Sequence, residues 1–305
     1  MKNLRLRMPK GPPPSSGRPP GPASEEEVRA LARFLRDGPV VVLAGAGCST
    51  ESGIPDYRGP SSRGRDRRPV LYQEFVRDPE ARSRYWARSA VGWPRFTLAR
   101  ANDAHRALAE LEAGGVVAGV ISQNVDGLHQ MAGSRSVLEL HGSLDRVRCL
   151  ECGATVSRLE VQRRLEELNP SFGWTDREAD GRDAPRSLAD GDAALEPSAH
   201  RGFQVPGCSR CGGILKPDVV FFGENVPRER VERAWDLFGR SRSLLVVGSS
   251  LTVYSGRRFV DRARLDGRPV AIVNVGPTRG DGPDILKVED RVGRVLPRVA
   301  ALVAS

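Results

Sequence analysis

The sequence lacks long apolar runs and has few lysines. The first shortage argues against a membrane-spanning protein, and the second weakens the case for a nucleic-acid-binding protein. No apolar run approaches the roughly 18 residues that a membrane-spanning helix needs, so we expect no transmembrane segment. No apolar segment follows the N-terminus, as a secretory signal would require. Only four of the 47 basic residues are lysines, an arginine bias typical of a GC-rich genome. The formal net charge of +9 is therefore a weak indication of nucleic-acid binding.

The charged residues are mixed in sign along most of the chain. Basic and acidic side chains alternate in segments such as 163–167, as on a solvated surface. We therefore predict no nucleic-acid partner. The segment 1–24 differs, because it is rich in proline and glycine and has no acidic residue before its end, and we expect a disordered tail. A transit peptide is the alternative, but prolines oppose the amphipathic helix that such a peptide needs.

The arrangement of the five cysteines indicates a reducing cellular compartment. Four of them form two Cys-x-x-Cys pairs, which fit metal-binding thiols in a reducing environment better than a disulfide framework. We therefore expect a bacterial cytoplasmic protein, with the mitochondrial matrix as the alternative.

Alternating apolar strands and helical patterns predict the fold class. Continuous apolar runs at 40–44, 116–121, 243–247 and 270–275 indicate buried parallel strands, with helical periodicity at 104–111 and 231–238 between them. A capping-box pattern, Ser24 and Glu27, predicts a first helix from about Glu25. The alternation predicts a Rossmann-like parallel α/β sheet with helices on both faces. In such a sheet the ligand binds at the carboxyl ends of the strands, where this sequence places Gly45, Gln123, Asn124, Gly248, Ser249, Ser250, Asn274, Val275 and Gly276.

Two stretches interrupt this alternation. Residues 148–212 begin and end near a cysteine pair, which predicts a small inserted zinc module in a Rossmann-like domain of residues 25–147 and 213–305. The polar centre of the module, about 176–199, is predicted to be a surface excursion. Residues 60–100 are arginine-rich and then aromatic, and we expect a helical excursion near the active site.

The cysteine pairs share one form, in which each pair is followed by glycine. Two sulfurs separated by two residues reach one metal ion, and the glycine permits the tight turn around them. Four sulfur ligands leave no open position for water, so the pattern predicts one structural zinc ion rather than a catalytic one. The predicted ligands are Cys149, Cys152, Cys208 and Cys211.

A glycine loop and a histidine are the candidate reactive elements. Gly45-Ala46-Gly47 after the first strand can hold a diphosphate, although Thr50 replaces the third glycine of the dinucleotide fingerprint, and a structural turn is an equal alternative. His141 at a strand end is placed to act as a base, and a core histidine is the competing interpretation. Cys48 is a nucleophile or a packed small residue; His105, His129 and His200 have weaker claims.

Several windows together resemble the sirtuins. They are 45–58, 123–126, 140–142, the two cysteine pairs, 216–224, 248–251 and 274–276, in the order of that family. The resemblance implies an NAD⁺-dependent protein lysine deacylase (deacetylase) that transfers the acyl group to ADP-ribose and releases nicotinamide, with acyl-lysine proteins as partners. His141 would be the catalytic base. Val219, Val220, Phe221 and Phe222 would bind the substrate as a strand, with the two phenylalanines walling the acyl-lysine tunnel.

The resemblance also implies the cofactor contacts. They are Gly45, Ala46, Gly47, Ser49, Ile54, Asp56, Tyr57, Arg58, Gln123, Asn124, Val125, Asp126, Gly248, Ser249, Ser250, Asn274, Val275, Gly276 and Val292. Segments 67–69, 75–77, 84–88 and 91–94 are similar to the lipoamidase-like class II branch, which has bacterial members. Tyr85 and Arg88 have the spacing of a succinyl-binding pair but lie in a helical pattern, so we do not predict desuccinylation from them.

Two other functions remain open. A mono-ADP-ribosyltransferase or a lipoamidase would share the NAD⁺ chemistry but use a different acceptor or acyl group. A zinc-ribbon nucleic-acid-binding regulator would use the basic charge and the cysteine site, but it leaves Asn124, Asp126 and His141 without a role.

Overall fold

Among the residues that the structure describes, the larger of two sheets has six strands, all parallel, in the order β3-β2-β1-β7-β8-β9. The computed structural model describes residues 21–56, 69–172, 191–193, 195 and 200–304. The strands are β1 (Val40–Ala44), β2 (Val117–Ser122), β3 (Val137–Glu139), β7 (Ser243–Val247), β8 (Val270–Val273) and β9 (Ile285–Val288). Counted within this sheet, the order is 3-2-1-4-5-6, which is that of dinucleotide-binding domains. The Rossmann-like prediction is confirmed.

Helices cover both faces of this sheet, as predicted. One face packs against α1 (Glu25–Arg36), α4 (Asp103–Ala113) and α9 (Val292–Ala304), and these elements share one apolar cluster with alternate residues of the strands. The other face packs against α7 (Arg228–Gly239) and α8 (Tyr254–Leu265). In β1, Val40 and Val42 belong to the first cluster and Val41 and Leu43 to the second. Burial on both faces explains why the strand sequences are apolar throughout rather than alternating.

The first helix begins where the capping box predicted. The Ser24 hydroxyl accepts a hydrogen bond from the Glu27 backbone N–H at 3.2 Å, and the Glu27 carboxylate accepts one from the Ser24 N–H at 2.7 Å. The predicted tail of residues 1–24 is too long, because Ala23 is 7% exposed and its N–H donates to Asp290 at 3.0 Å. Residues 1–20 lie outside the described part of the chain.

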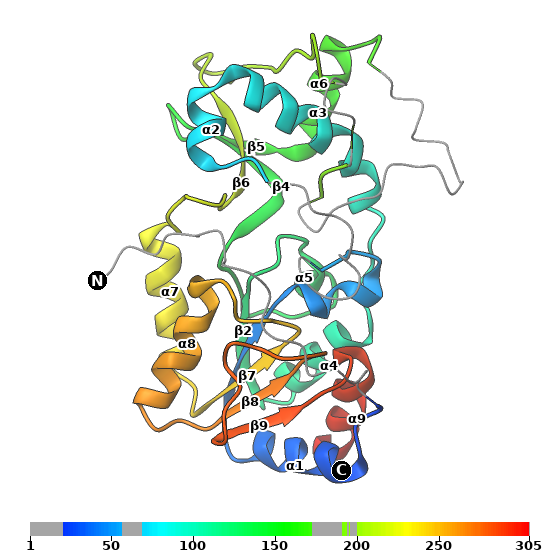
Figure 1. The fold of residues 1–305 in the computed structure, drawn as a ribbon, viewed down its shortest axis with the longest axis vertical. Helices are drawn as coiled ribbons and strands as arrows, with labels where there is room; N and C mark the ends of the chain where they lie inside the picture. The colour runs from blue at the N-terminus through cyan, green and yellow to red at the C-terminus, as the bar shows by residue number, and fades with distance from the viewer. Residues whose placement is uncertain (1–20, 57–68, 173–190, 194, 196–199, 305) are drawn as a thin grey trace.

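A smaller lobe lies above the large sheet in Figure 1. Its antiparallel sheet has the order β5-β4-β6, formed by β4 (Gly142–Cys149), β5 (Thr155–Ser157) and β6 (Leu215–Val219). Three helices join it, α2 (Tyr72–Arg77), α3 (Pro79–Phe96) and α6 (Arg158–Leu168). Phe75 and Trp86 from the helices share a core with Val147 and Leu215 of the sheet. The module is therefore wider than the predicted range 148–212 and includes the helical excursion.

Part of the predicted surface excursion is buried. Asp192 has no exposed surface and Ala193 is 1% exposed. The Arg88 guanidinium of α3 pairs with the Asp192 carboxylate at 2.9 Å, so the succinyl-type spacing of Tyr85 and Arg88 is used in the lobe interior. A Cβ at Gly92 would lie 2.0 Å from the Gly191 oxygen, which explains a glycine inside α3. Residues 173–190, 194 and 196–199 of the excursion are outside the described residues.

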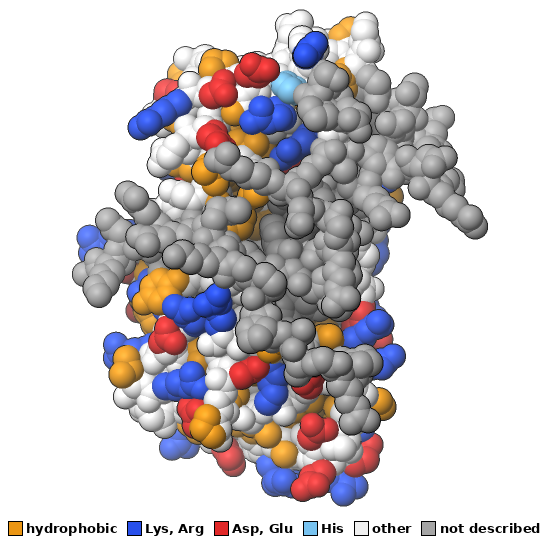
Figure 2. Space-filling view, viewed as in Figure 1, with side chains coloured by type: hydrophobic (Ala, Val, Ile, Leu, Met, Phe, Trp, Pro, Cys, Tyr) orange, Lys and Arg blue, Asp and Glu red, His pale blue; other side chains and the backbone are white. Residues whose placement is uncertain are grey.

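The surface is mixed in charge on the face shown in Figure 2. Basic and acidic side chains lie among one another over the described part of the large lobe. Among the described residues, no helix is long and apolar enough to cross a bilayer.

Candidate functional site

Two glycine-bearing loops meet where the strand order of the large sheet reverses. β1 ends before Gly45 and the adjacent β7 ends before Gly248, and the Gly47 N–H donates to the Gly248 oxygen at 2.8 Å. A Cβ at Gly45 would lie 2.7 Å from the Gly248 oxygen, and one at Gly47 would lie 2.9 Å from the Gly248 Cα. Only glycine permits this approach. The reversal point is where ligands bind in this class of sheet, so the loop geometry fits a dinucleotide diphosphate.

Polar side chains that follow β2 form hydrogen bonds with the first glycine loop, which begins at Gly45. The Ser49 hydroxyl donates to Asp126 at 2.7 Å, and the Asn124 amide donates to the Gly45 oxygen and to Ser49, both at 3.1 Å. Burial raises the pKa of Asp126, while hydrogen bonds from the Leu128 backbone and from Ser49 oppose that rise. The structure thus joins the predicted residues of two loops into one network at the carboxyl edge of the sheet.

The other half of the carboxyl edge of the large sheet consists of the residues that follow β7, β8 and β9. The Ser249 hydroxyl donates to the Gln123 side chain at 2.8 Å, which links the β7 loop to the β2 loop. The Asn274 amide donates to the oxygens of Val275 and Gly276 at 2.9 and 3.1 Å. The other predicted cofactor residues at this half are Ser250, which pairs with Thr252, and Val292, which begins α9 and is 3% exposed.

The rest of the glycine loop leads toward the small lobe. Two short 3-10 helices, η1 (Ala46–Cys48) and η2 (Thr50–Ser52), follow β1. Ile54 is 6% exposed and packs with Trp93 and Phe96 of α3. Asp56 is the last described residue of this loop. The predicted cofactor residues Tyr57 and Arg58 lie outside the described residues.

His141 follows β3 and is 8% exposed. Its Nδ1 is 2.9 Å from the Gln123 backbone oxygen, and its Nε2 is 2.8 Å from the Ser255 hydroxyl. A carbonyl oxygen can only accept, so Nδ1 carries the proton, and Ser255 must donate to the lone pair of Nε2. Burial lowers the pKa of His141 to about 4, with the Arg230 charge adding to that effect. The imidazole is therefore neutral at pH 7, with Nε2 as its basic nitrogen.

Ser255 was not among the predicted site residues. It lies in the first turn of α8 and has no exposed surface. The contact joins residues 114 positions apart, and no local pattern in the sequence marks a serine as the partner of a distant histidine. Its place just after the Gly248–Ser250 cluster is the one signal that could have drawn attention to it.

The predicted substrate-binding strand is only partly a strand. β6 ends at Val219, which pairs with Gly142, and the Val220 N–H donates to the His141 oxygen at 2.8 Å. Phe221 packs in the core of the small lobe, with its ring centroid 5.2 Å from that of Phe75. Phe222 is half-buried, and its backbone oxygen accepts from Tyr72 at 2.9 Å. The segment is thus anchored beside His141, and Phe221 joins it to the aromatic cluster of the small lobe.

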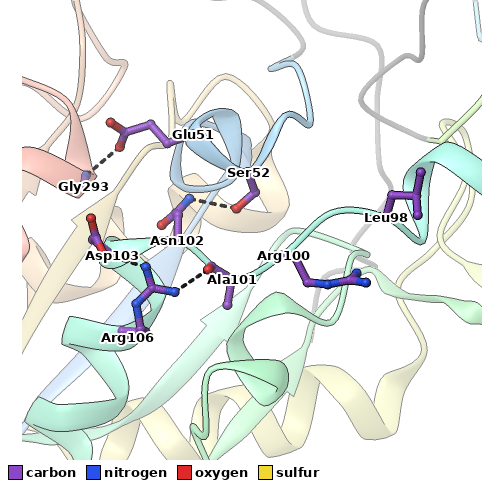
Figure 3. A pocket seen from close by; sticks show the side chains of 9 residues that line it. All are labelled: Glu51, Ser52, Leu98, Arg100, Ala101, Asn102, Asp103, Arg106 and Gly293. Atoms are coloured by element: carbon purple, nitrogen blue, oxygen red, sulfur yellow. Dashed lines mark hydrogen bonds and ion pairs between the residues drawn. The ribbon is translucent and has the colours of Figure 1, made fainter. Parts of the chain in front are cut away.

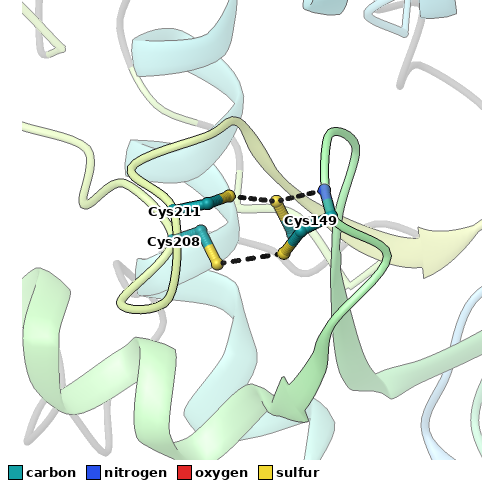
Figure 4. Close-up of side chains that lie close together, drawn as sticks. Cys149, Cys208 and Cys211 are labelled. Atoms are coloured by element: carbon teal, nitrogen blue, oxygen red, sulfur yellow. Dashed lines mark hydrogen bonds between the residues drawn. The ribbon is translucent and has the colours of Figure 1, made fainter.

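The four cysteines of the two pairs converge in the small lobe (Figure 4). The Cys149 and Cys211 sulfurs are 3.5 Å apart, and those of Cys152 and Cys208 are 3.8 Å apart. A tetrahedral zinc ion with Zn–S bonds of about 2.3 Å places its sulfurs roughly 3.8 Å apart. The donor set and its spacing therefore fit the predicted structural zinc. Cys149 ends β4, the strand that begins directly after His141.

A separate cavity of about 440 Å³ lies behind the glycine loop (Figure 3). Its lining includes Glu51 and Ser52 of η2, Asn102 and Arg106 at the start of α4, and Gly293. The Gly293 N–H donates to Glu51 at 3.0 Å. None of the predicted cofactor residues that the structure describes lines this cavity.

Three buried histidines predict acid destabilisation. Burial lowers the pKa values of His105 and His141 to about 4 and that of His129 to about 3, from 6.5. Between pH 6.5 and about 4 the unfolded chain therefore binds protons that the folded chain does not, and stability is lost as the pH falls. We expect the melting temperature to drop through this range and the His129→Gln variant to drop less. A melting temperature that is flat from pH 7 to 5 would contradict this.

The fold and the site define a dinucleotide-binding α/β protein with an inserted lobe suited to structural zinc. Comparison with known proteins narrows this class. The profile of the Sir2 family matches residues 45–255. The chain is 50% identical over 291 residues to NAD-dependent protein deacetylase 1 of Streptomyces coelicolor, covering 92% of this chain and 94% of that protein. It is 52% identical over 276 residues to the NAD-dependent protein deacetylase of Xanthomonas campestris pv. campestris, with 90% and 89% covered.

Solved structures agree with the sequence relatives. A Sir2 enzyme superposes with a TM-score of 0.71 at 34% identity, covering 92% of this chain and 99% of that one. A Sir2–p53 peptide–NAD⁺ complex gives a TM-score of 0.68 at 30% identity, covering 89% and 96%. The chain belongs to the Sir2 family, the sirtuins.

Proposed function

We propose that the chain is an NAD⁺-dependent protein lysine deacetylase, which transfers the acyl group of lysine to ADP-ribose and releases nicotinamide. The observation that carries the proposal is the state of His141, a buried neutral imidazole with its basic Nε2 directed at Ser255. It adjoins both the cofactor network, through Gln123, and the anchored segment at Val220. A base that remains neutral well below pH 7 suits a reaction in which a ribose hydroxyl must lose its proton.

Each part of the site has a role in this reaction. Bound NAD⁺ supplies the ribose carbon that the acyl-lysine oxygen attacks, with nicotinamide as the leaving group. Gly45 and Gly47 hold the diphosphate by backbone approach, and Asn124 and Asp126 orient the nicotinamide ribose. When the Ser255 hydroxyl turns away from Nε2, that nitrogen of His141 accepts the ribose hydroxyl proton, and its Nδ1–H stays on the Gln123 oxygen, which keeps the ring oriented.

The proposed partners are acetylated proteins. Peptides bound by main-chain hydrogen bonds gain affinity with loose sequence preference, and the segment after Val219 is the candidate for that pairing. We place the reaction in the bacterial cytoplasm, since the zinc-binding thiols must remain reduced.

The test is a mass-spectrometric assay of the full chain with NAD⁺ and matched acetyl-, propionyl-, succinyl- and lipoyl-lysine peptides. We expect free nicotinamide and O-acyl-ADP-ribose in equal amounts, with the acetyl peptide as substrate. ADP-ribosylated protein without acyl-ADP-ribose would replace the proposal with a transferase, and turnover of the lipoyl peptide alone would replace it with a lipoamidase. No nicotinamide release with any peptide from zinc-loaded protein would refute all three.

Ser255 is expected to position the base. Replacing it with alanine removes one hydrogen bond to His141, so kcat should fall about 3- to 10-fold while KM for NAD⁺ stays unchanged. The Ser255→Thr variant keeps a hydroxyl and should recover most of the activity. Steady-state kinetics of both variants, with their melting temperatures, provide the measurement. A rise in KM with unchanged kcat, or equal losses in both variants, would argue for a packing role only.

A further inference from the structure

Three potential metal ligands meet in the large lobe, away from the four-cysteine site. Cys48 belongs to η1 in the glycine loop, His105 to the first turn of α4, and His129 to α5 (Leu128–Met131). They are 1%, 0% and 1% exposed, respectively. One ligand atom from each lies within 4.8 Å of the others, and the two imidazole centroids are 4.8 Å apart. The proposed deacetylation uses none of these side chains.

The imidazole nitrogens in this cluster lack partners. Among the described residues, neither nitrogen of His129 has a hydrogen-bond partner, and the Nε2 of His105 has none. The other nitrogen of His105, Nδ1, lies 3.0 Å from the Asn102 side-chain oxygen and 3.3 Å from the Asn102 backbone N–H, so it can donate to the first or accept from the second. A buried polar atom without a partner costs about 1–3 kcal/mol, so three such atoms in one cluster call for an explanation.

The chemistry of the three groups suits a metal ion. Burial keeps both imidazoles neutral by lowering their pKa values, and a neutral imidazole is the ligand form. In the tautomer whose Nδ1–H donates to the Asn102 side-chain oxygen, Nε2 of His105 has a free lone pair, as in metal-bound histidines, and a bound metal would select this tautomer over the one that accepts from the Asn102 N–H. Bonds of about 2.0–2.3 Å place ligand atoms roughly 3.5 Å apart, so side-chain shifts of about 1 Å would close the site.

We propose that Cys48, His105 and His129 form a buried binding site for one Cu⁺ ion. Thiolate and imidazole ligands suit monovalent copper. On binding, the Cys48 thiol loses its proton to solvent and the sulfur–copper bond forms. A monovalent cation with one thiolate and two neutral imidazoles has no net charge, so this site avoids the cost of burying one. Burial and the negative charges of Asp126 and Glu51 raise the pKa of the Cys48 thiol, so the thiol gives up its proton only as the bond to the metal forms.

The site is part of the glycine loop. The Cys48 N–H donates to the Gly45 oxygen at 2.9 Å, and the Cys48 oxygen accepts from the Asn102 amide at 2.9 Å. Asn102 also donates to Ser52 at 3.0 Å and lines the cavity shown in Figure 3. A metal bound by Cys48 therefore ties η1 to α4 and α5, and it should stabilise the fold around the diphosphate loop.

The experiment is a Cu⁺ titration of the zinc-loaded full chain under anaerobic conditions, against a chromophoric Cu⁺ chelator. Zinc release is followed in the same cuvette with a zinc dye. We expect one equivalent of copper to bind without zinc release, with a thiolate-to-copper absorption band and a higher melting temperature. Cys48→Ala and His129→Gln should each weaken this binding by roughly 100-fold or more, since even outer-shell changes cost 10- to 100-fold. His200→Gln, in the small lobe, is the matched control and should bind like the parent.

Three results would overturn the proposal. They are no copper retained against the chelator, equal retention in the parent and in both cluster variants, or zinc released one-for-one with copper uptake, which would place the copper at the four-cysteine site. The melting temperature and zinc content of each variant before titration establish that it is folded. These readouts do not involve deacetylation, so the copper site can fail while the proposed function stands.

Discussion

Replacing His141 with alanine is expected to lower kcat for deacetylation about 100- to 10,000-fold, the range that a general base contributes. This expectation follows from the tautomer of the His141 imidazole. With Nδ1–H held by the Gln123 oxygen, Nε2 is the one nitrogen of the ring that can accept a proton. The described Ser49–Asn124–Asp126 network offers no second imidazole, since its other members are a hydroxyl, an amide and a carboxyl group.

The measurement is steady-state release of O-acetyl-ADP-ribose by the variant. Its zinc content, melting temperature and affinity for NAD⁺ serve as controls, because the loss of a buried imidazole also leaves a cavity. His200→Gln is the matched histidine variant, 8% exposed like His141 but in the small lobe and outside the proposed reaction, and it should retain most of the parent kcat. A His141→Ala variant that keeps its fold and works within tenfold of the parent would remove His141 from the role of base.

Short sequence patterns predicted the parts of the fold that depend on residues close together in the sequence. The apolar run of β1, the Gly45–Gly47 loop and the capping box at Ser24 are each set by neighbours in sequence. The strand β9 escaped prediction because it is short, with four residues, and only partly buried, and β3, with three residues, was anticipated only as the strand end at His141. Neither run is long enough to be distinguished from a loop by periodicity.

Contacts between distant segments account for the remaining differences. Phe75 and Trp86 joined the small lobe by packing against strands that come more than 60 residues later, which no window of sequence reveals. The same holds for the burial of Asp192 against Arg88 and for Ser255 beside His141. The predicted site residues came from short motifs at strand ends. Their hydrogen bonds to one another depend on the order of the strands in the sheet, which no local sequence pattern determines.

Loss of a zinc ligand is expected to be the second large effect. In Cys208→Ser one sulfur of the tetrahedral set is missing, and we expect the protein to lose its zinc and more than about 4 kcal/mol of stability. For a domain of 150–250 residues this corresponds to a fall of roughly 10 °C or more in melting temperature. Metal analysis and thermal unfolding measure both quantities, and Cys48→Ala, which removes a cysteine outside the zinc site, should keep its zinc.

Activity should fall together with the zinc, because one strand connects the two sites. β4 runs from Gly142, next to the base, to the zinc ligand Cys149, and it pairs with β6, which leads into the segment anchored at His141. Disorder in the small lobe would also free Trp93 and Phe96, which pack on Ile54 of the cofactor loop. Chelated parent enzyme should therefore regain activity when zinc is restored, whereas Cys208→Ser should not. Full activity in zinc-free protein would mean that the large lobe holds its catalytic geometry without the small one.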